Sequence, residues 1–506
     1  MNKTYIRVLF TLFICFMLGC QSDNSSPGAT DINMREGERL ANQYCGSCHA
    51  PVAPRYLDKE TWQDNILPVM APKLGIRVYR KKQYYPDPKG SQVSIEEWQK
   101  IVRFFAQNAP DSLEIPSSNH QVKKDSSLFS IRKPHQADTS KNVAANTLVA
   151  FHPSNHTIYT SDGTQKRLFR WNRDLEPSPI EELKIAGVHS SFLKDSTGQQ
   201  YGIFTSIGTL PPVDIANGKV WELNMENDSI RTIAEGLPRP VHSVSGDFNN
   251  NGLQDWVVCG FGHQKGGLYL LEQQGNRQFK KKIIRPVPGA VDAETGDFNS
   301  DGWLDIMVLF AHGDEGIWLM LNDKKGGFNQ DNIIRLPPVY GSTSFQLEDF
   351  NRDGNIDILY TSGDNADYSQ ILKPYHGIYI FINQGDFTFE QEYFYQLNGA
   401  TEAVAKDFDG DGDLDIVAHA FFADLKNDPS ESFVYLEQDQ PLSFTPKTLD
   451  IHHLGRWLTM DVGDFEGDGD LDIILGNHSR QFIGEGNLNQ NWNTSLPFIL
   501  LLNNTQ

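Results

Sequence analysis

From about residue 147 to the C-terminus, short apolar runs rich in β-branched and aromatic residues alternate with clusters of Gly, Asn and Asp. Runs such as IMVLFA (306–311) and IVAHAFF (416–422) are continuously apolar, which indicates strands buried on both faces. A second run of the same kind follows each of them, and most lead on to a third segment. The pattern predicts a β unit of three or four strands that repeats along the chain.

Five polar loops with a common plan stand between the strands of these units: DFNNNGLQD from Asp247, DFNSDGWLD from Asp297, DFNRDGNID from Asp349, DFDGDGDLD from Asp407 and DFEGDGDLD from Asp464. Each loop has oxygen-bearing side chains at positions 1, 3, 5 and 9, Gly at position 6 for a sharp turn, and a free backbone carbonyl at position 7. Hard oxygen ligands at this density suit Ca²⁺, and carboxylates this close together repel one another without a cation. The loops lack the Glu at position 12 and the flanking helices of an EF-hand.

We expect these loops to bind up to five Ca²⁺ ions, most simply in a structural role. The expected ligands, with position 7 acting through its carbonyl, are Asp247, Asn249, Asn251, Leu253, Asp255, Asp297, Asn299, Asp301, Trp303, Asp305, Asp349, Asn351, Asp353, Asn355, Asp357, Asp407, Asp409, Asp411, Asp413, Asp415, Asp464, Glu466, Asp468, Asp470 and Asp472. The first loop carries Asn at positions 3 and 5 and should bind most weakly. Glu466 is longer than the Asp or Asn of the other loops and alters the geometry of the last site.

One loop plus three or four strands in about 50 residues makes one blade of a β-propeller. Residues 240–505 resemble the FG-GAP or VCBS repeat family, whose blades carry calcium loops of this form, as in integrin α-subunit propellers. Residues 188–206 align with residues 241–260 as a blade that has lost its acidic loop, and NTLVAFHPSNHTIYTSDG resembles a further degenerate blade. The resemblance implies a closed, seven-bladed propeller over residues 147–506.

The last blade ends at FILLLNNTQ, one strand short. The segment SLFSIRKP (127–134) resembles KKIIRP (281–286), which occupies a fourth-strand position. We expect residues 127–134 to complete the last blade, which would remove an exposed edge. The alternative is that residues 111–146 are only a linker.

The N-terminal part has a different periodicity, typical of helices. Residues 34–44 carry apolar side chains at helical spacing, and residues 94–107 begin with a capping box of Ser94 and Glu97 before one apolar stripe. Between them lies Cys45-Gly46-Ser47-Cys48-His49. Its thiols are spaced to form thioether bonds to the vinyl groups of one haem c, and the adjacent imidazole can bind the iron.

Residues 33–110 resemble the class I cytochrome c family, a small all-α domain. The resemblance implies a covalent haem on Cys45 and Cys48, with His49 and Met70 as the axial iron ligands. A Met/His pair raises the haem potential and leaves no open position for a substrate. Met70 is otherwise an ordinary core residue. The alternatives for the two thiols are a redox dithiol or half of a zinc site, but no second Cys pair accompanies them.

The first residues read as an export signal. Lys3 and Arg7 precede an apolar run from Val8 to Leu18, too short for a stable membrane span. Met17-Leu18-Gly19-Cys20 resembles a bacterial lipobox, which implies a signal peptide of residues 1–19, lipid attachment at Cys20 and a flexible tether of residues 20–32. The expected location is the periplasmic or cell-surface side of the envelope, at the outer membrane, through this lipid anchor.

The chain of 506 residues has a formal net charge of −21, which five Ca²⁺ ions would reduce to −11. No basic cluster suggests nucleic acid as a partner. Cys259 lies alone in an apolar run and is expected to be buried, so no disulfide framework is available. The predicted fold class is multidomain: a small all-α cytochrome c domain (33–110), a linker (111–146) and an all-β propeller (147–506).

Function is harder to read than fold. Charged and polar residues just ahead of the loops are candidates to line the propeller channel: His189, His242, Asp292, Glu294, Glu402 and Arg456. No Ser/His/Asp order or nucleophile elbow is legible. We therefore expect a membrane-anchored electron carrier, not an enzyme, whose propeller docks a redox partner protein or an extracellular polymer. The alternatives are a dehydrogenase or lyase propeller with the haem as electron acceptor, and a glycan-binding adhesion lipoprotein with an ancillary haem.

Overall fold

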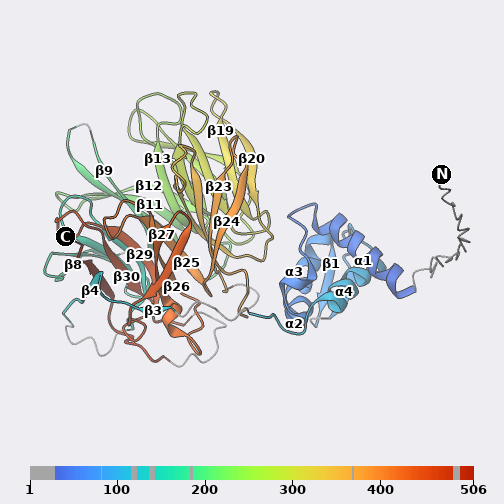
Figure 1. The fold of residues 1–506 in the computed structure, drawn as a ribbon. Helices are drawn as coiled ribbons and strands as arrows, with labels where there is room; N and C mark the ends of the chain where they lie inside the picture. Colours follow the sequence, from blue (N-terminus) through green and yellow to red (C-terminus); the bar gives the residue numbers. More distant parts are fainter. Residues whose placement is uncertain are drawn as a thin grey trace, which may run out of the picture.

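The computed structural model describes residues 29–80, 82–115, 122–135, 143–182, 186–195, 197–366, 370–481 and 490–505. A mostly helical N-terminal domain, blue in Figure 1, lies beside a large β-domain. The predicted signal peptide and the lipobox with Cys20 lie outside the described residues. No helix in the described part of the chain is long and apolar enough to cross a membrane.

The helical domain is built on two long helices that pack against each other. Its elements are α1 (Ala29–Cys45), η1 (Pro54–Tyr56), α2 (Lys59–Thr61), η2 (Trp62–Ile66), α3 (Leu67–Met70), η3 (Ala71–Leu74), β1 (Ile76–Tyr79), β2 (Gln83–Pro86) and α4 (Ile95–Asn108). The predicted capping box of α4 is confirmed: the Glu97 backbone N–H donates to Ser94 Oγ, and the Ser94 N–H donates to the Glu97 carboxylate.

The expectation of an all-α domain is incomplete, because β1 and β2 form an antiparallel hairpin. The hairpin turns at Arg80, which has a positive φ of 45°. Its buried side includes Ile76 and the ring of Tyr84, which meets the indole of Trp98 edge-on at 5.6 Å between ring centroids. Burying these side chains against α4 stabilises the hairpin.

Seven four-stranded or five-stranded sheets make up the β-domain within the described residues. In chain order, their strands are β5 (Asn146–Phe151), β6 (Ile158–Asp162), β7 (Arg167–Trp171) and β8 (Pro177–Glu182); β9 (Ala186–Lys194), β10 (Gln200–Gly208), β11 (Gly218–Asn224) and β12 (Ile230–Leu237); β13 (Pro240–Gly246), β14 (Asp255–Gly260), β15 (Gly267–Gln273) and β16 (Phe279–Arg285); β17 (Ala290–Gly296), β18 (Asp305–Phe310), β19 (Gly316–Asn322) and β20 (Phe328–Arg335); β21 (Ser342–Glu348), β22 (Asp357–Ser362), β23 (Gly377–Asn383) and β24 (Phe389–Gln396); β25 (Ala400–Lys406), β26 (Asp415–Ala420), β27 (Phe433–Gln440) and β28 (Ser443–Thr448); and β29 (Trp457–Gly463), β30 (Asp472–Asn477) and β31 (Phe498–Asn503). A short 3₁₀ helix, η4 (Pro429–Ser432), precedes β27.

The sheets are the blades of a seven-bladed propeller. The first strand of each blade contacts the first strand of the next, and β29 of the last blade contacts β5 of the first. The second strands of the five blades with polar loops are buried at every position, as their continuous apolar runs predict. Apolar side chains between neighbouring blades form the core, for example where Phe408 and Tyr435 of one blade meet Trp457 and Leu475 of the next.

The ring is closed by a strand from ahead of the propeller. β4 (Phe129–Arg132) pairs antiparallel with β31 and supplies the fourth strand of the last blade, with Ile131 opposite Leu501. Phe129 is buried and packs edge-on against the rings of Phe408 and Tyr435. A second short strand, β3 (Lys123–Lys124), extends the neighbouring blade by pairing parallel with β28, which the sequence pattern does not reveal.

The two faces of the propeller differ. The five polar loops join first to second strands and therefore share one face. The opposite face carries the connections from second to third strands and between blades. Tyr340 lies in a connection between two blades and Tyr375 in a connection from a second to a third strand, so both residues are on this opposite face. Both rings contact Tyr56 of the helical domain. The Tyr375 hydroxyl also donates to the Tyr56 carbonyl at 3.0 Å. The helical domain thus contacts the face opposite the polar loops.

Candidate functional site

The Cys45–His49 segment lies at the end of α1, where the helix stops. Cys45 is half-buried and Cys48 exposed, and neither forms a disulfide. Burial and the neighbouring Cys48 raise the pKa of the Cys45 thiol to about 11.

His49 is held by its own backbone. Its Nδ1 lies 2.7 Å from the Ala50 carbonyl oxygen, which can only accept, so the proton sits on Nδ1 and Nε2 keeps its lone pair. Imidazoles that bind a metal are usually oriented by such a second contact. The residues present therefore fit a haem bound through two thioethers and His49 Nε2. Met70 ends α3 and is partly buried against the core of this domain.

The five polar loops share one hydrogen-bond scheme. The position-1 carboxylate accepts backbone N–H groups from across the loop, as Asp247 does from Asn251 and Gly252. The position-6 glycines have positive φ, from 80° at Gly252 to 98° at Gly469, so the predicted sharp turn is present in all five.

The position-9 carboxylate has a structural task of its own. It is buried in every loop, and each of its oxygens accepts a backbone N–H: in the fourth loop Asp415 accepts from Phe408 and Gln438 and also from the Tyr435 hydroxyl. The same two backbone contacts recur at Asp255, Asp305, Asp357 and Asp472. These residues fasten each loop to the third strand of its blade.

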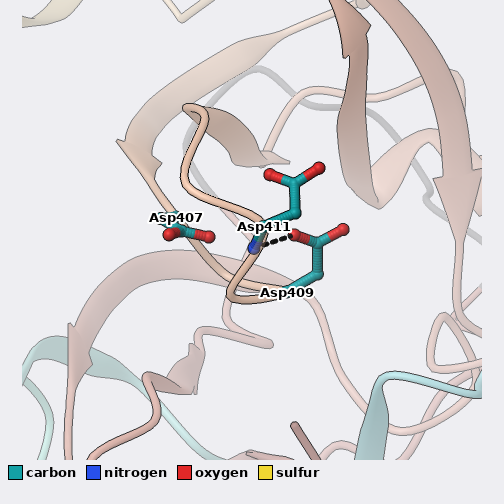
Figure 2. Close-up of side chains that lie close together, drawn as sticks. All are labelled: Asp407, Asp409 and Asp411. Carbon is teal, nitrogen blue, oxygen red and sulfur yellow. Dashed lines mark hydrogen bonds between the residues drawn. The ribbon is translucent and has the colours of Figure 1, made fainter.

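The fourth loop has the strongest cation geometry. Asp407, Asp409 and Asp411 present carboxylate oxygens that all lie within 4.8 Å of one another, the one such group of three among the described His, Cys, Asp and Glu side chains (Figure 2). Asp413 Oδ1 is buried and has no hydrogen-bond partner. Burial, together with neighbouring carboxylates, raises the pKa of Asp409 and Asp413. This oxygen-only set fits Ca²⁺.

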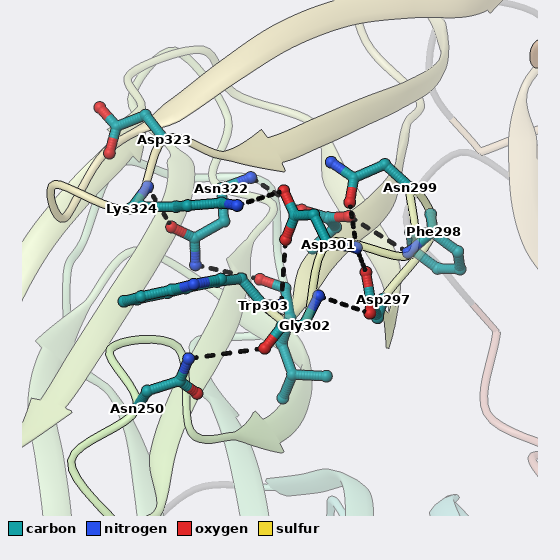
Figure 3. Close-up of polar contacts among 12 residues, drawn as sticks. Asn250, Asp297, Phe298, Asn299, Asp301, Gly302, Trp303, Asn322, Asp323 and Lys324 are labelled. Carbon is teal, nitrogen blue, oxygen red and sulfur yellow. Dashed lines mark hydrogen bonds and ion pairs between the residues drawn. The ribbon is translucent and has the colours of Figure 1, made fainter.

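The second loop is partly neutralised by the protein itself. Lys324, from the hairpin between β19 and β20, places its ammonium 3.2 Å from Asp301 Oδ2 (Figure 3). Asn322, on the same hairpin, donates to the carbonyls of Leu304 and of Phe248 in the preceding blade. The Lys324 ammonium would therefore compete with a bound cation for the Asp301 carboxylate.

The last loop also departs from the common plan. The Glu466 carboxylate lies 3.9 Å from the Arg132 guanidinium of β4, and Arg173 donates to the Glu466 carbonyl. Burial and the neighbouring Asp468 raise the pKa of Asp470 to about 7. Position 3 of this loop therefore contacts the ring-closing strand.

A channel of about 1010 Å³ runs along the propeller axis, lined by the first strands of all seven blades. Each first strand has a β-bulge near its beginning, and the residue directly after the bulge lines the channel in every blade. We call these seven residues the channel belt: Leu148, His189, His242, Asp292, Ser344, Glu402 and Thr459. Six of the seven are polar.

Three members of the belt are in direct contact. The rings of His189 and His242 lie 3.9 Å apart between centroids, and His242 Nε2 lies 3.3 Å from Asp292 Oδ1. Asp292 is held by the backbone N–H groups of Ala293 and Phe345. Burial lowers the pKa of His242 to about 4 and raises that of Asp292 to about 6. Burial, followed by the neighbouring His242, holds the pKa of His189 well below its usual value.

Two residues further along the same strands, Glu294 and Asp461 form a second polar tier of the channel. Burial raises the pKa of each to about 7, and nearby carboxylates add to the effect. Of the six residues predicted to line the channel, His189, His242, Asp292, Glu294 and Glu402 do so. Arg456 does not: it is buried with its guanidinium 3.7 Å from the centre of the Phe421 ring.

Sequence reasoning missed Asp461, Ser344 and Thr459. The signal was available in the repeat itself, since Ser344 and Thr459 occupy the register of His242 in later blades. Asp461 accepts the Phe151 N–H at 2.6 Å and so links the last blade to the first. Asp461 thus accepts a backbone N–H from the neighbouring blade, as Asp292 does from Phe345.

A comparison with protein families identifies the repeat. A model of the FG-GAP-like repeat matches residues 247–308 and 297–360, and each match begins at the first Asp of a polar loop. No curated protein gives a significant match. Among solved structures, the chain is similar to streptogramin B lyase (TM-score 0.47, 10% identity, 76% of this chain and 100% of that one) and to the N-terminal domain of Nup159 (TM-score 0.44, 11% identity, 76% and 97%). The chain thus carries FG-GAP-like repeats within a seven-bladed propeller.

Proposed function

We propose that this protein is a c-type cytochrome that transfers electrons, held by a lipid on Cys20 at the outer membrane of a bacterium, on its periplasmic or cell-surface side. Its propeller, stabilised by Ca²⁺, docks a redox partner protein or an extracellular polymer. A bound haem would supply reversible one-electron transfer at its iron. The observation that supports this best is the pair of unpaired thiols at the end of α1 beside His49, whose Nδ1 is engaged and whose Nε2 is left to bind the iron.

The decisive test is covalent haem attachment in cells that make c-type cytochromes. The chain should gain the mass of one haem and the absorbance of a low-spin c-type centre, and Cys45→Ala/Cys48→Ala should lose both. Cys259→Ala is the matched control, because this thiol is buried in the propeller. Covalent haem on the double variant, or none on the wild type, would contradict the proposal.

The sixth ligand can be tested separately. Met70→Ala should lower the haem potential and abolish the sulfur-to-iron charge-transfer band, because a thioether ligand favours reduced iron. Met34→Ala in α1 controls for loss of a methionine in the same domain. A band that persists in Met70→Ala assigns the sixth position to another residue.

Lipid attachment at Cys20 can be tested by cell fractionation. Cys20→Ser should move the protein from the membrane fraction to the soluble envelope fraction without changing its haem content, since the lipid is the proposed attachment. Membrane association that survives this change would rule out Cys20 as the anchor.

A second candidate function rests on the channel. Contacting imidazole and carboxylate groups in a cavity of this size are typical of ligand and active sites. In this version the propeller is either a dehydrogenase domain that passes electrons from its substrate to the haem, or a lyase domain, whose reaction releases no electrons. Reduction of the haem by an added substrate, lost in His242→Gln, would favour this candidate over simple electron carriage.

A further inference from the structure

Carboxyl groups dominate the ionisable lining of the channel. Its described lining includes Asp292, Glu294, Glu402, Asp461 and Asp464, and no Lys or Arg. A cavity lined by carboxylates without a basic residue repels anions and attracts cations. This alone does not identify a site, because solvated carboxylates do the same.

The two imidazoles add a second, independent observation. Nδ1 of His189 and Nδ1 of His242 are both buried and both without a hydrogen-bond partner in the described structure. A buried polar atom without a partner costs free energy, which a bound ligand can offset. The two rings are in contact, so the atoms lie on one part of the channel wall.

Asp292 determines which nitrogen of His242 is available. His242 Nε2 lies 3.3 Å from Asp292 Oδ1, so a ring protonated on Nε2 faces the carboxylate with its N–H and keeps its lone pair on Nδ1. Asp292 is itself held by two backbone N–H groups, so the carboxylate beside this ring has a fixed position. A carboxylate behind an imidazole is the usual support of a metal-binding histidine.

We propose that His189 and His242 bind one divalent transition-metal ion, of the imidazole-preferring kind exemplified by Zn²⁺, on the channel wall. Channel water completes its coordination, and Asp292 is a positioning residue. Neutral imidazole suits Zn²⁺, whereas the oxygen-only loops suit Ca²⁺, so the two kinds of site are chemically separate. The proposal does not depend on the haem.

The test is zinc binding by the full-length chain after chelation and resaturation with Ca²⁺, which keeps zinc off the polar loops. Equilibrium dialysis against micromolar Zn²⁺ with metal analysis should give one bound zinc per chain. His189→Gln and His242→Gln should each weaken binding by about 100-fold, and Asp292→Asn by about 10–100-fold with the stoichiometry preserved.

His453→Gln is the matched control, because this histidine is exposed on the surface. Unchanged zinc binding in the two channel variants would overturn the proposal. So would loss of zinc in Cys45→Ala/Cys48→Ala or Asp409→Asn, which would assign the metal to the thiols or the fourth loop. Binding only at millimolar Zn²⁺ counts against the site as well.

A measurement on the wild type covers the case in which the channel variants fail to fold. Diethylpyrocarbonate modifies accessible neutral imidazoles, and peptide mass analysis locates the adducts. Zn²⁺ should protect His189 and His242 at least tenfold while leaving His453 reactive. Equal modification with and without Zn²⁺ would overturn the proposal.

Discussion

One residue type serves two purposes in the polar loops, and position decides which. The aspartates at positions 1, 3 and 5 surround the space in which a cation would sit, as in Asp407, Asp409 and Asp411. The aspartate at position 9, such as Asp415, is buried and joined to two backbone segments. Both kinds of position hold Asp in the fourth loop, so the sequence pattern cannot distinguish a metal ligand from a structural anchor.

Two variants of the fourth loop should separate these roles. Asp415→Ala should destabilise the protein by about 3 kcal/mol even in EGTA, because two backbone N–H groups and the Tyr435 hydroxyl lose their partner. Asp411→Ala, at an exposed position, should reduce the melting temperature only when Ca²⁺ is present. Thermal unfolding with and without EGTA provides the measurement; equal effects of Asp411→Ala in both conditions would argue against a cation in this loop.

Glu315 should make stability depend on pH. It is buried, its Oε1 accepts from the Ser342 backbone and hydroxyl, and burial raises its pKa from 4.5 to about 8. The folded chain therefore keeps a proton that the unfolded chain releases above pH 4.5, so the free energy of unfolding falls as pH rises towards 8.

Glu315→Gln removes this titration. Its melting temperature relative to wild type should rise between pH 5 and pH 9, because only the wild type has to bury a charge at high pH. Glu390→Gln, at an exposed site, should show no such trend. A flat difference for Glu315→Gln would mean that Glu315 is ionised in the folded protein across this range.

Residue-level prediction succeeded where local chemistry decides and failed where distant strands meet. The Ser94 and Glu97 capping box needs only spacing within one turn, and the structure confirms it. The channel position of His242 and Asp292 followed from their place ahead of the loops. Arg456 shares that place in sequence but is stacked on Phe421, a contact between blades that no local pattern encodes.

At the scale of elements, the repeat made the blades predictable. Continuous apolar runs indicated strands buried on both faces, and the second strands such as β18 and β26 are buried throughout. The hairpin of β1 and β2 was missed because its strands are four residues long and depend on packing against α4. β3, with two residues, has no sequence signal at all; its register exists only against β28.

The β19–β20 hairpin should control how tightly the second loop binds a cation. Removing the ammonium in Lys324→Ala should tighten binding about fivefold, the scale expected of a partly exposed ion pair. Tb³⁺ can stand in for Ca²⁺, since Trp303 lies in this loop and can sensitise its luminescence. Trp303→Phe should abolish the signal, and an affinity unchanged by Lys324→Ala would show that the ammonium does not compete.

At the scale of the molecule, the likeness between residues 127–134 and residues 281–286 pointed to the strand that completes the ring. β4 pairs with β31 although almost the whole propeller sequence separates the two strands along the chain. The contact of the helical domain with Tyr340 and Tyr375 was not predictable, because it joins surfaces whose residues are unremarkable in their own segments.

Two truncated chains should test the closing strand. A chain starting at residue 122 keeps β3 and β4 and should fold as a monomer. A chain starting at residue 143 leaves β31 as an open edge and should melt at a lower temperature and associate, because unpaired strand edges recruit other chains. Light scattering and thermal unfolding compare them; identical behaviour would mean that β4 contributes little.

The pairing of β4 with β31 also sets the order of events when the chain is made. Phe129 emerges early from the ribosome, yet its partner strand is almost the last segment to be synthesised. The propeller thus stays an incomplete arc until the final residues are made, and a product that stops before Phe498 carries two unpaired strand edges. An interrupted chain therefore differs from a finished one by strand edges open to pairing with other chains.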